Sequence, residues 1–214
     1  GPRNSRIRPG GHSMKKSVFA LLIPILVVAS LGSAEEPEYT RWKLEYEYST
    51  PDYVAMKDAL GKQHVCWFIT YKVTNKSDKD IPLGIQISAE TEDKLKYLDS
   101  ISPLAQKALE KKTGKKYKNA LEMRKGTIGA KQSIEAVAFL GSLDPNFDFL
   151  YVTVDGLVDR ISKEDGEMWY EQKVLVVTYY RPGDEFDSAN DEITWKSDEW
   201  KVLDRKKIEQ TPKE

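Results

Sequence analysis

Six lysines within twelve residues form a basic cluster and are the chain's first candidates for a binding site. They are Lys107, Lys111, Lys112, Lys115, Lys116 and Lys118, which crowd around the expected end of a helix. Such a cluster could receive an anionic partner, such as a cell-wall polymer, an acidic glycan or an acidic protein surface. It could equally be a solvated helix face, with the lysine stems along the surface and the ammonium groups in water. Binding by exposed charges would weaken with salt, because salt screens them over about 10 Å.

His64 and Cys66 have the spacing of two metal ligands on one face of an expected strand. Structural zinc takes four ligands, whereas the chain has one cysteine and two histidines, of which only His64 follows the N-terminal segment. We therefore predict no metal site, an ordinary strand-end histidine, and a cysteine that packs as a small apolar residue. Gly-x-Ser-x-Gly, Walker and His-Glu-x-x-His motifs are also lacking, and we predict no cofactor.

Two groups of acidic residues are candidates for other chemistry. The segment from Asp184 to Glu192 is rich in the oxygen ligands that calcium prefers, but its spacing is not that of an EF-hand. A solvated hairpin loop is the alternative. Asp155 and Asp159 flank Gly156 at the end of an expected strand, and glycoside hydrolases use a pair of carboxylates. Nothing in the sequence distinguishes these two acids, so we assign no catalytic residue and predict that the protein is not an enzyme.

Residues 14–34 have the parts of an export signal peptide. Met14-Lys15-Lys16 is a basic start, residues 18–31 are mainly apolar, and Gly32-Ser33-Ala34 supplies small residues for cleavage. The apolar run is shorter than the about 20 residues of a spanning helix. We predict cleavage after Ala34 and export to the periplasm or the medium, with an uncleaved anchor as the alternative. Residues 1–13 are expected to be vector-derived or an over-extended gene prediction.

The charge of the processed chain excludes one class of partner. Five of the 33 Lys and Arg residues precede Glu35, whereas none of the 34 acidic residues does, so the remainder has a net charge of −6. Nucleic-acid binding depends on basic residues that neutralise phosphates, and we predict none. A single cysteine allows no internal disulfide. The core must therefore stabilise the fold unaided.

Alternating apolar residues predict strands along most of the chain. Residues 39–48 alternate as one half-exposed strand, and residues 51–62 form a connector with one possible helical turn. The two apolar runs at 65–75 and 81–90 surround a charged loop, and we predict that they pair as antiparallel strands. Further strands are expected at 133–143, 149–158, 168–180 and 193–203, with a hairpin turn at 163–166.

Residues 92–129 interrupt this pattern as an expected helical insertion. Ser102 and Pro103 are suited to begin a helix, and Gly114 is suited to end it. With about seven strands and one insertion, the predicted fold is an immunoglobulin-like antiparallel β-sandwich. We expect this domain to cover residues 35–204, followed by a flexible charged tail at 205–214.

Three stretches resemble a group of exported bacterial proteins of unknown function. They are the aromatic-x-x-Thr-Tyr-x-Val-x-Asn run at 67–75, Val-x-Val-x-Gly-Leu at 152–157, and Leu-x-x-x-Tyr-x-x-Pro-Gly at 175–183. The resemblance extends from Trp67 to about Val202. It implies an immunoglobulin-like fold and export, and it implies no activity and no site residues.

The leading functional prediction is a non-enzymatic structural or protein-interaction module of the bacterial cell envelope. A sandwich offers sheet edges and end loops as contact surfaces. Its partner would be an envelope protein or a glycan. The second hypothesis is a glycan-binding or small-ligand module that uses residues 92–129 and 181–192. The third is a hydrolase with an unrecognised carboxylate pair.

Overall fold

The computed structural model describes residues 40–144, 146–181 and 192–208. Leader residues 1–13, the signal at 14–34 and nearly all of the calcium candidate at 184–192 lie outside the described residues. Glu192 is the one member of that candidate within them, and it is exposed.

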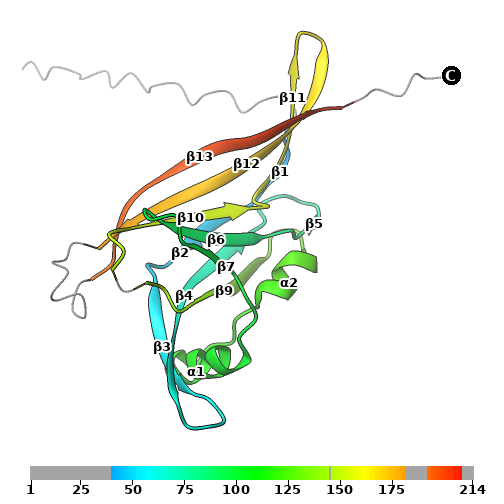
Figure 1. Ribbon diagram of the computed structural model, residues 1–214. Coiled ribbons are helices and arrows are strands. Elements are labelled where there is room, and N and C mark those ends of the chain that lie inside the picture. Colours follow the sequence, from blue (N-terminus) through cyan, green and yellow to red (C-terminus); the bar gives the residue numbers. More distant parts are fainter. Residues whose placement is uncertain (1–39, 145, 182–191, 209–214) are drawn as a thin grey trace, which may run out of the picture. The chain divides into compact units, whose positions relative to one another are not determined.

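The described residues are mainly β, as predicted, with thirteen strands and two helices (Figure 1). The strands are β1 (Thr40–Lys43), β2 (Glu45–Tyr48), β3 (Asp52–Lys57), β4 (Gln63–Thr74), β5 (Ile81–Pro82), β6 (Gln86–Thr91), β7 (Lys96–Leu98), β8 (Thr127–Ile128), β9 (Ser133–Gly141), β10 (Phe149–Asp155), β11 (Val158–Glu164), β12 (Glu167–Tyr180) and β13 (Thr194–Lys207). The helices are α1 (Pro103–Thr113) and α2 (Ala120–Lys125).

All strand pairs within the sheets are antiparallel. The larger sheet has the order β1-β11-β12-β10-β6-β7, and β13 also pairs with β12. The smaller sheet contains β2, β3, β4 and β9, and a two-stranded sheet joins β5 to β8. The larger sheet lies above the smaller one in Figure 1.

One hydrophobic core joins the two sheets, because alternate residues of their strands face each other. The smaller sheet contributes Ile69, Tyr71 and Val73 of β4, and the larger sheet contributes Val152 of β10 and Val177 of β12. A second cluster lies on the opposite face of the smaller sheet, beneath α1. Its buried members are Val54, Cys66, Phe68, Ala105, Leu109, Val137 and Phe139. The smaller sheet is therefore covered on both faces.

The expected strand at 39–48 is in fact divided between the two sheets. β1 pairs with β11 in the larger sheet, and β2 pairs with β4 in the smaller one. The chain crosses at Leu44, which is buried and whose backbone N–H donates to the carbonyl of Leu157 at 2.8 Å. Alternation reports which side chains are buried, and it does not report that a strand changes its sheet.

The predicted pairing of residues 65–75 with 81–90 is wrong. β4 belongs to the smaller sheet and β6 to the larger one. The loop between them is a crossover, closed by the Asn75 amide nitrogen, which donates to the carbonyls of Lys79 and Gly129 at 2.7 and 3.0 Å. Both runs face the shared core, so their patterns match although they do not pair.

The expected connector at 51–62 is a strand instead of a helical turn. β3 pairs with β4 over six residues. Asp58 shapes the turn that follows, since its Oδ1 accepts hydrogen bonds from the backbone N–H groups of Leu60 and Lys62 at 2.9 Å each. The hairpin turn at 163–166 is confirmed, with Asp165 and Gly166 at φ 51° and 85°.

The helical insertion contains α1 where it was predicted and also α2, which was not. Gly114 ends α1 at φ 71°, in the left-handed region that glycine favours. Ser102 precedes α1 but makes no capping hydrogen bond. Asn119 caps α2 fully, because its side chain accepts from the helix start while Glu122 accepts from the Asn119 N–H. At the other end of the chain, β13 extends to Lys207, within the segment expected to be a flexible tail.

Candidate functional site

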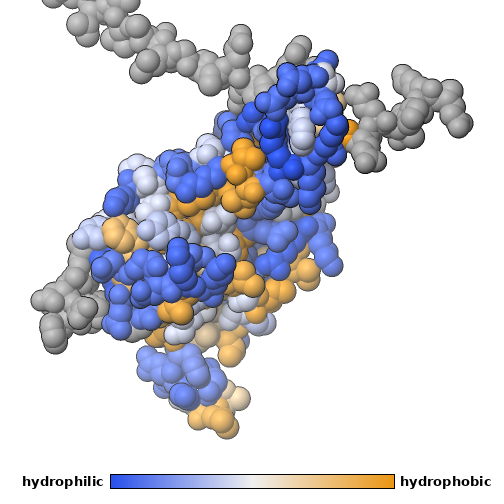
Figure 2. Space-filling model, turned by 45° about the horizontal axis from the view of Figure 1, so that its top comes forward, coloured by the Kyte–Doolittle hydropathy of each residue, from blue (hydrophilic) through white to orange (hydrophobic). Residues whose placement is uncertain are grey.

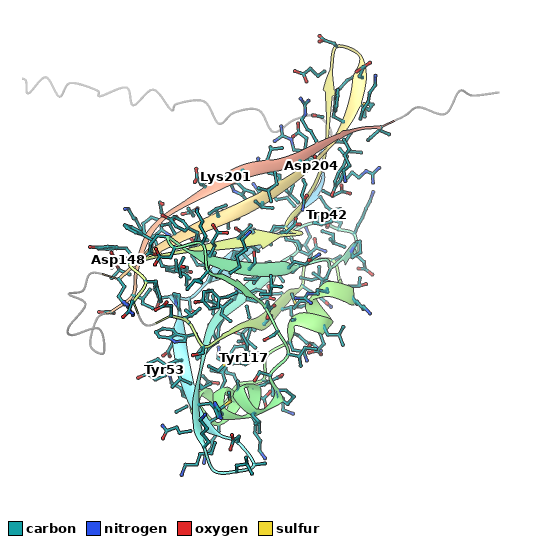
Figure 3. All side chains as sticks on the ribbon, viewed as in Figure 1. Trp42, Tyr53, Tyr117, Asp148, Lys201 and Asp204 are labelled. Atoms are coloured by element: carbon teal, nitrogen blue, oxygen red, sulfur yellow. The ribbon has the colours of Figure 1, made fainter. Side chains whose placement is uncertain are left out.

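β13 is a free edge of the larger sheet. It pairs with β12 along its length, and no described strand lies on its other side. All fourteen of its residues are exposed, including Trp195, Trp200, Val202 and Leu203. The strand runs along the margin of the sheet in Figure 1, and Figure 3 labels Lys201 and Asp204 on it. An edge of this length presents unpaired backbone N–H and C=O groups to another chain.

A bulge divides β13 into a half without net charge and a basic half. Val202 is opposite Lys173 and Asp204 is opposite Gln172, so Leu203 is the extra residue. A second irregularity lies near the start of the strand, at the β12 residues Thr178 and Tyr179. Before the central bulge Asp198-Glu199 is balanced by two lysines, and after it Asp204 is followed by Arg205-Lys206-Lys207.

The basic half of β13 is attached to its own sheet by ion pairs to Glu164, Glu167 and Glu171, of which only Glu171 is buried. Glu171 of β12 is 6% exposed. Its oxygens lie 2.9 Å from Arg160 Nε and 3.0 Å from Arg205 Nε, and it accepts a 2.8 Å hydrogen bond from Ser162. The Arg205 guanidinium also lies 4.9 Å from the ring centre of Trp169. A buried carboxylate is tolerated when it is paired in this way.

The larger sheet forks in the middle of β12. Residues 175–180 of β12 pair with β10, and residues 167–171 pair with β11. A cavity of about 550 Å³ lies at this fork. Asp155 at the end of β10, Asp159 of β11, Trp42 of β1 and Gln172 of β12 are among its lining residues. The structure therefore brings the two carboxylates singled out in the sequence to one cavity.

Gly156 allows the turn between β10 and β11 to lie against the backbone of Gly84, before β6. Its φ is +81°, and a Cβ at this position would lie 2.4 Å from the carbonyl oxygen of Gly84. Only glycine fits both the left-handed conformation and this close backbone approach. The link before β6 is thereby held against the turn between β10 and β11, and both line the cavity.

Both carboxylates at the fork already have neighbours. Asp155 accepts hydrogen bonds from the Gln172 amide at 2.6 Å and from the Gly156 N–H at 2.7 Å. Asp159 lies 3.5 Å from Arg41. Because Arg41 and Lys173 also line the cavity, its charges are balanced. A second cavity of about 350 Å³ shares Gln86 and Asp155 with the first, so the two are adjacent.

Half of the predicted lysine cluster is neutralised by acidic neighbours. The ammonium groups of Lys112, Lys115 and Lys118 lie 2.6, 2.9 and 2.6 Å from Asp52, Glu135 and Glu122. The hydrogen bond and charge of Glu135 raise the pKa of Lys115. Lys107, Lys111 and Lys116 are exposed without an ion pair to another described residue. The cluster is therefore a weaker anion site than its sequence suggests.

His64 and Cys66 lie near the start of β4, where Cys66 is buried and His64 is partly exposed. The His64 ring lies 2.8 Å from Asp58 at the β3–β4 turn, and its hydrogen bond lowers the pKa of Asp58. Cys66 is buried, and burial raises the pKa of its thiol. Within the described ranges, no group of three or more His, Cys, Asp and Glu residues is placed to hold a metal ion.

Asp99 is a buried titratable residue that the sequence did not indicate. It is 4% exposed, and its Oδ1 accepts the backbone N–H of Phe139 at 3.1 Å. Burial raises its pKa to about 7, against the opposing influence of the Phe139 hydrogen bond and the Arg124 charge. An aspartate after Tyr97-Leu98 has no sequence signal that separates it from a solvated one.

Comparison with known proteins adds no relative. The chain matches no family model, no curated protein and no solved structure. Among the described helices, none has the length and apolar character needed to cross a membrane. The exposed edge and the fork are therefore the two features from which a function can be inferred.

Proposed function

We propose that the protein is a non-enzymatic interaction module of the bacterial cell envelope, which binds a protein partner by strand addition to β13. The observation that carries this proposal is that all fourteen consecutive residues of a strand paired on one side only are exposed. In strand addition, backbone hydrogen bonds to a free edge supply affinity, and side chains supply specificity. Export is proposed from the signal-like segment at 14–34, and the two sheets around one core support an immunoglobulin-like sandwich.

Site-specific photo-crosslinking in cells that make the protein tests this function. A photoreactive residue at position 201 should give covalent adducts with a protein, because this position lies on the free edge. The matched control is position 107, another exposed lysine, which lies on α1. Adducts at 107 and none at 201 would contradict the proposal and would favour the lysine cluster as the binding site.

A second candidate function is binding of a neutral saccharide at the fork. The cavity combines the ring of Trp42 with planar polar groups of Asp155 and Gln172, and its opposite charges balance. Its volume lies in the range of ligand sites, which carry a few placed polar groups. The adjoining cavity would extend the site for a chain of sugar units. Figure 2 turns the larger sheet toward the viewer and shows apolar residues within a mostly hydrophilic surface.

Calorimetric titration with chitotetraose, a neutral oligosaccharide, tests this second function. We expect saturable binding that weakens about tenfold in Gln172→Ala, which removes one hydrogen-bonding group. Gln63→Ala, at an exposed position of β4, is the matched control and should bind as the parent does. No heat of binding at millimolar saccharide would remove saccharide binding and leave the edge proposal standing.

A further inference from the structure

We infer that the partner on the β13 edge is β13 of a second copy of this chain, antiparallel, with the two-fold axis at the Val202–Leu203 bulge. This inference rests on the proposed function of β13 as a contact edge. It commits to a second copy because the charges of the strand are self-complementary in one register.

Pairing with β12 assigns each β13 side chain to a face of the sheet. Trp200 is opposite Leu175, and Arg205 is opposite Glu171. Leu175 and Glu171 are four residues apart on β12, so they share one face, and Trp200 and Arg205 share it too. Without the bulge, Trp200 and Arg205 would lie on opposite faces, because they are an odd number of residues apart.

By the same reasoning, Lys201 and Asp204 share the other face. Lys201 is opposite Val174 and Asp204 is opposite Gln172. The bulge therefore restores the symmetry that a two-fold pair requires, since residues at equal distance from the axis must lie on the same face. An axis through the bulge satisfies this condition along both halves of the strand.

No pair that this axis creates between Asp198 and Lys207 joins like charges. Counting outward from the bulge, the pairs across the interface are Lys201 with Asp204, Trp200 with Arg205, Glu199 with Lys206, and Asp198 with Lys207. Three of them join opposite charges. In the fourth, Trp200 lies opposite Arg205, whose guanidinium stays with Glu171 of its own copy. The two-fold axis repeats each pair, so these contacts flank the apolar centre formed by Val202 and Leu203 on both sides.

The neighbouring symmetric registers are unfavourable. Val202 and Leu203 count as one position here, because Leu203 is the extra residue of the bulge. If the axis moves to Lys201, Glu199 opposes Asp204 and the two copies of Lys201 oppose each other. If it moves to Asp204, Lys201 opposes Lys206 and the two copies of Asp204 meet. Like charges directly opposite each other destabilise a strand pair. The charges of β13 thus select one register and reject a slip in either direction.

The pairing leaves the buried Glu171 network in place. Within one copy, Lys201 and Lys206 pair with Glu199 and Asp204 of the same exposed strand, at 2.6 and 3.4 Å. Lys207 pairs with Glu167 of β12, and both of these side chains are exposed. Exposed ion pairs of this kind are weak and exchange readily for new partners. Charges on an edge normally prevent pairing with an arbitrary chain; here they permit pairing with a copy of the same strand.

Analytical ultracentrifugation with two charge-reversal variants tests the inference. The parent chain should dimerise at about 10 to 100 µM. Lys201→Glu places a carboxylate opposite Asp204, and Asp204→Lys places an ammonium group opposite Lys201, so each variant should dimerise at least about tenfold more weakly. Mixed together, the two variants should form a heterodimer, because one of its two central pairs joins the introduced glutamate to the introduced lysine and the other restores Lys201 with Asp204. Lys107→Glu on α1 is the control for the change in net charge.

Each outcome decides the inference. A parent chain that stays monomeric at about 100 µM would overturn self-pairing, while crosslinks from position 201 to a different protein would still support the interaction function. A dimer unaffected by either reversal would place its interface away from β13 and overturn the inference. Thermal melts of both variants should match the parent, since both positions are exposed.

Discussion

Replacement of Gly156 by alanine should destabilise the fold far more than the same change at Gly166. Both glycines have positive φ, +81° and +85°, and a left-handed alanine costs about 1 to 2 kcal/mol. At Gly156 the added methyl group would also lie 2.4 Å from the Gly84 carbonyl oxygen, whereas at Gly166 no atom lies within 4 Å. Backbone shifts that relieve such a clash cost about 1 to 3 kcal/mol more.

Urea denaturation of the two variants measures this difference. We expect a loss of about 1 to 2 kcal/mol for Gly166→Ala and about 2 to 5 kcal/mol for Gly156→Ala. Tyrosine and tryptophan fluorescence follows the transition, with equal m-values as the check that the unfolded states are comparable. Equal losses in the two variants would refute the close contact between the Gly84 and Gly156 backbones, and with it the geometry of the fork.

Three further predictions concern the core, the helix ends and the effect of pH. Leu109→Ala should cost about 2 to 5 kcal/mol, because Leu109 is fully buried on the inner face of α1; Leu104→Ala, at an exposed site of the same helix, should change the urea midpoint little. Asn119→Ala should cost about 1 kcal/mol, whereas Ser102→Ala should cost almost nothing, since only Asn119 makes capping hydrogen bonds. The pKa of Asp99 is raised to about 7, so its contribution to stability is present below about pH 4 and is lost as pH rises through about 7. Asp99→Asn should therefore remove a fall in unfolding free energy of up to about 4 kcal/mol between these pH values; an unchanged pH profile would contradict a protonated buried carboxyl.

The sequence predicted burial well and connectivity poorly. The alternation in β4, β9 and β10 correctly placed residues that face the shared core, such as Ile69, Ala138 and Val152, because a two-residue period follows directly from strand geometry. The same period says nothing about which strand is the neighbour, so β4 and β6 were paired wrongly although they face one core. The crossing of the chain between the two sheets at Leu44 was not predicted for the same reason, since the alternation continues through it.

The candidate sites were predicted only in part, because they depend on tertiary proximity. Asp155 and Asp159 were recognised as a pair, but their cavity depends on Arg41 and Gln172, which come from other parts of the chain. The lysine cluster was overrated because Asp52 and Glu135, which neutralise two of its members, come from other strands. β13 was recognised as a strand, but its position at an edge depends on sheet order, which local patterns do not contain.

The most direct test of the central claim is hydrogen exchange of the β13 backbone amides as a function of protein concentration. Amides that point away from β12 are unpaired in one isolated copy and should exchange rapidly at low concentration. On association through this edge, those between Asp198 and Lys207 should become protected, while amides of α1 keep their rates. Rapid exchange of these β13 amides in a sample shown to be associated would contradict the claim that β13 is the contact edge.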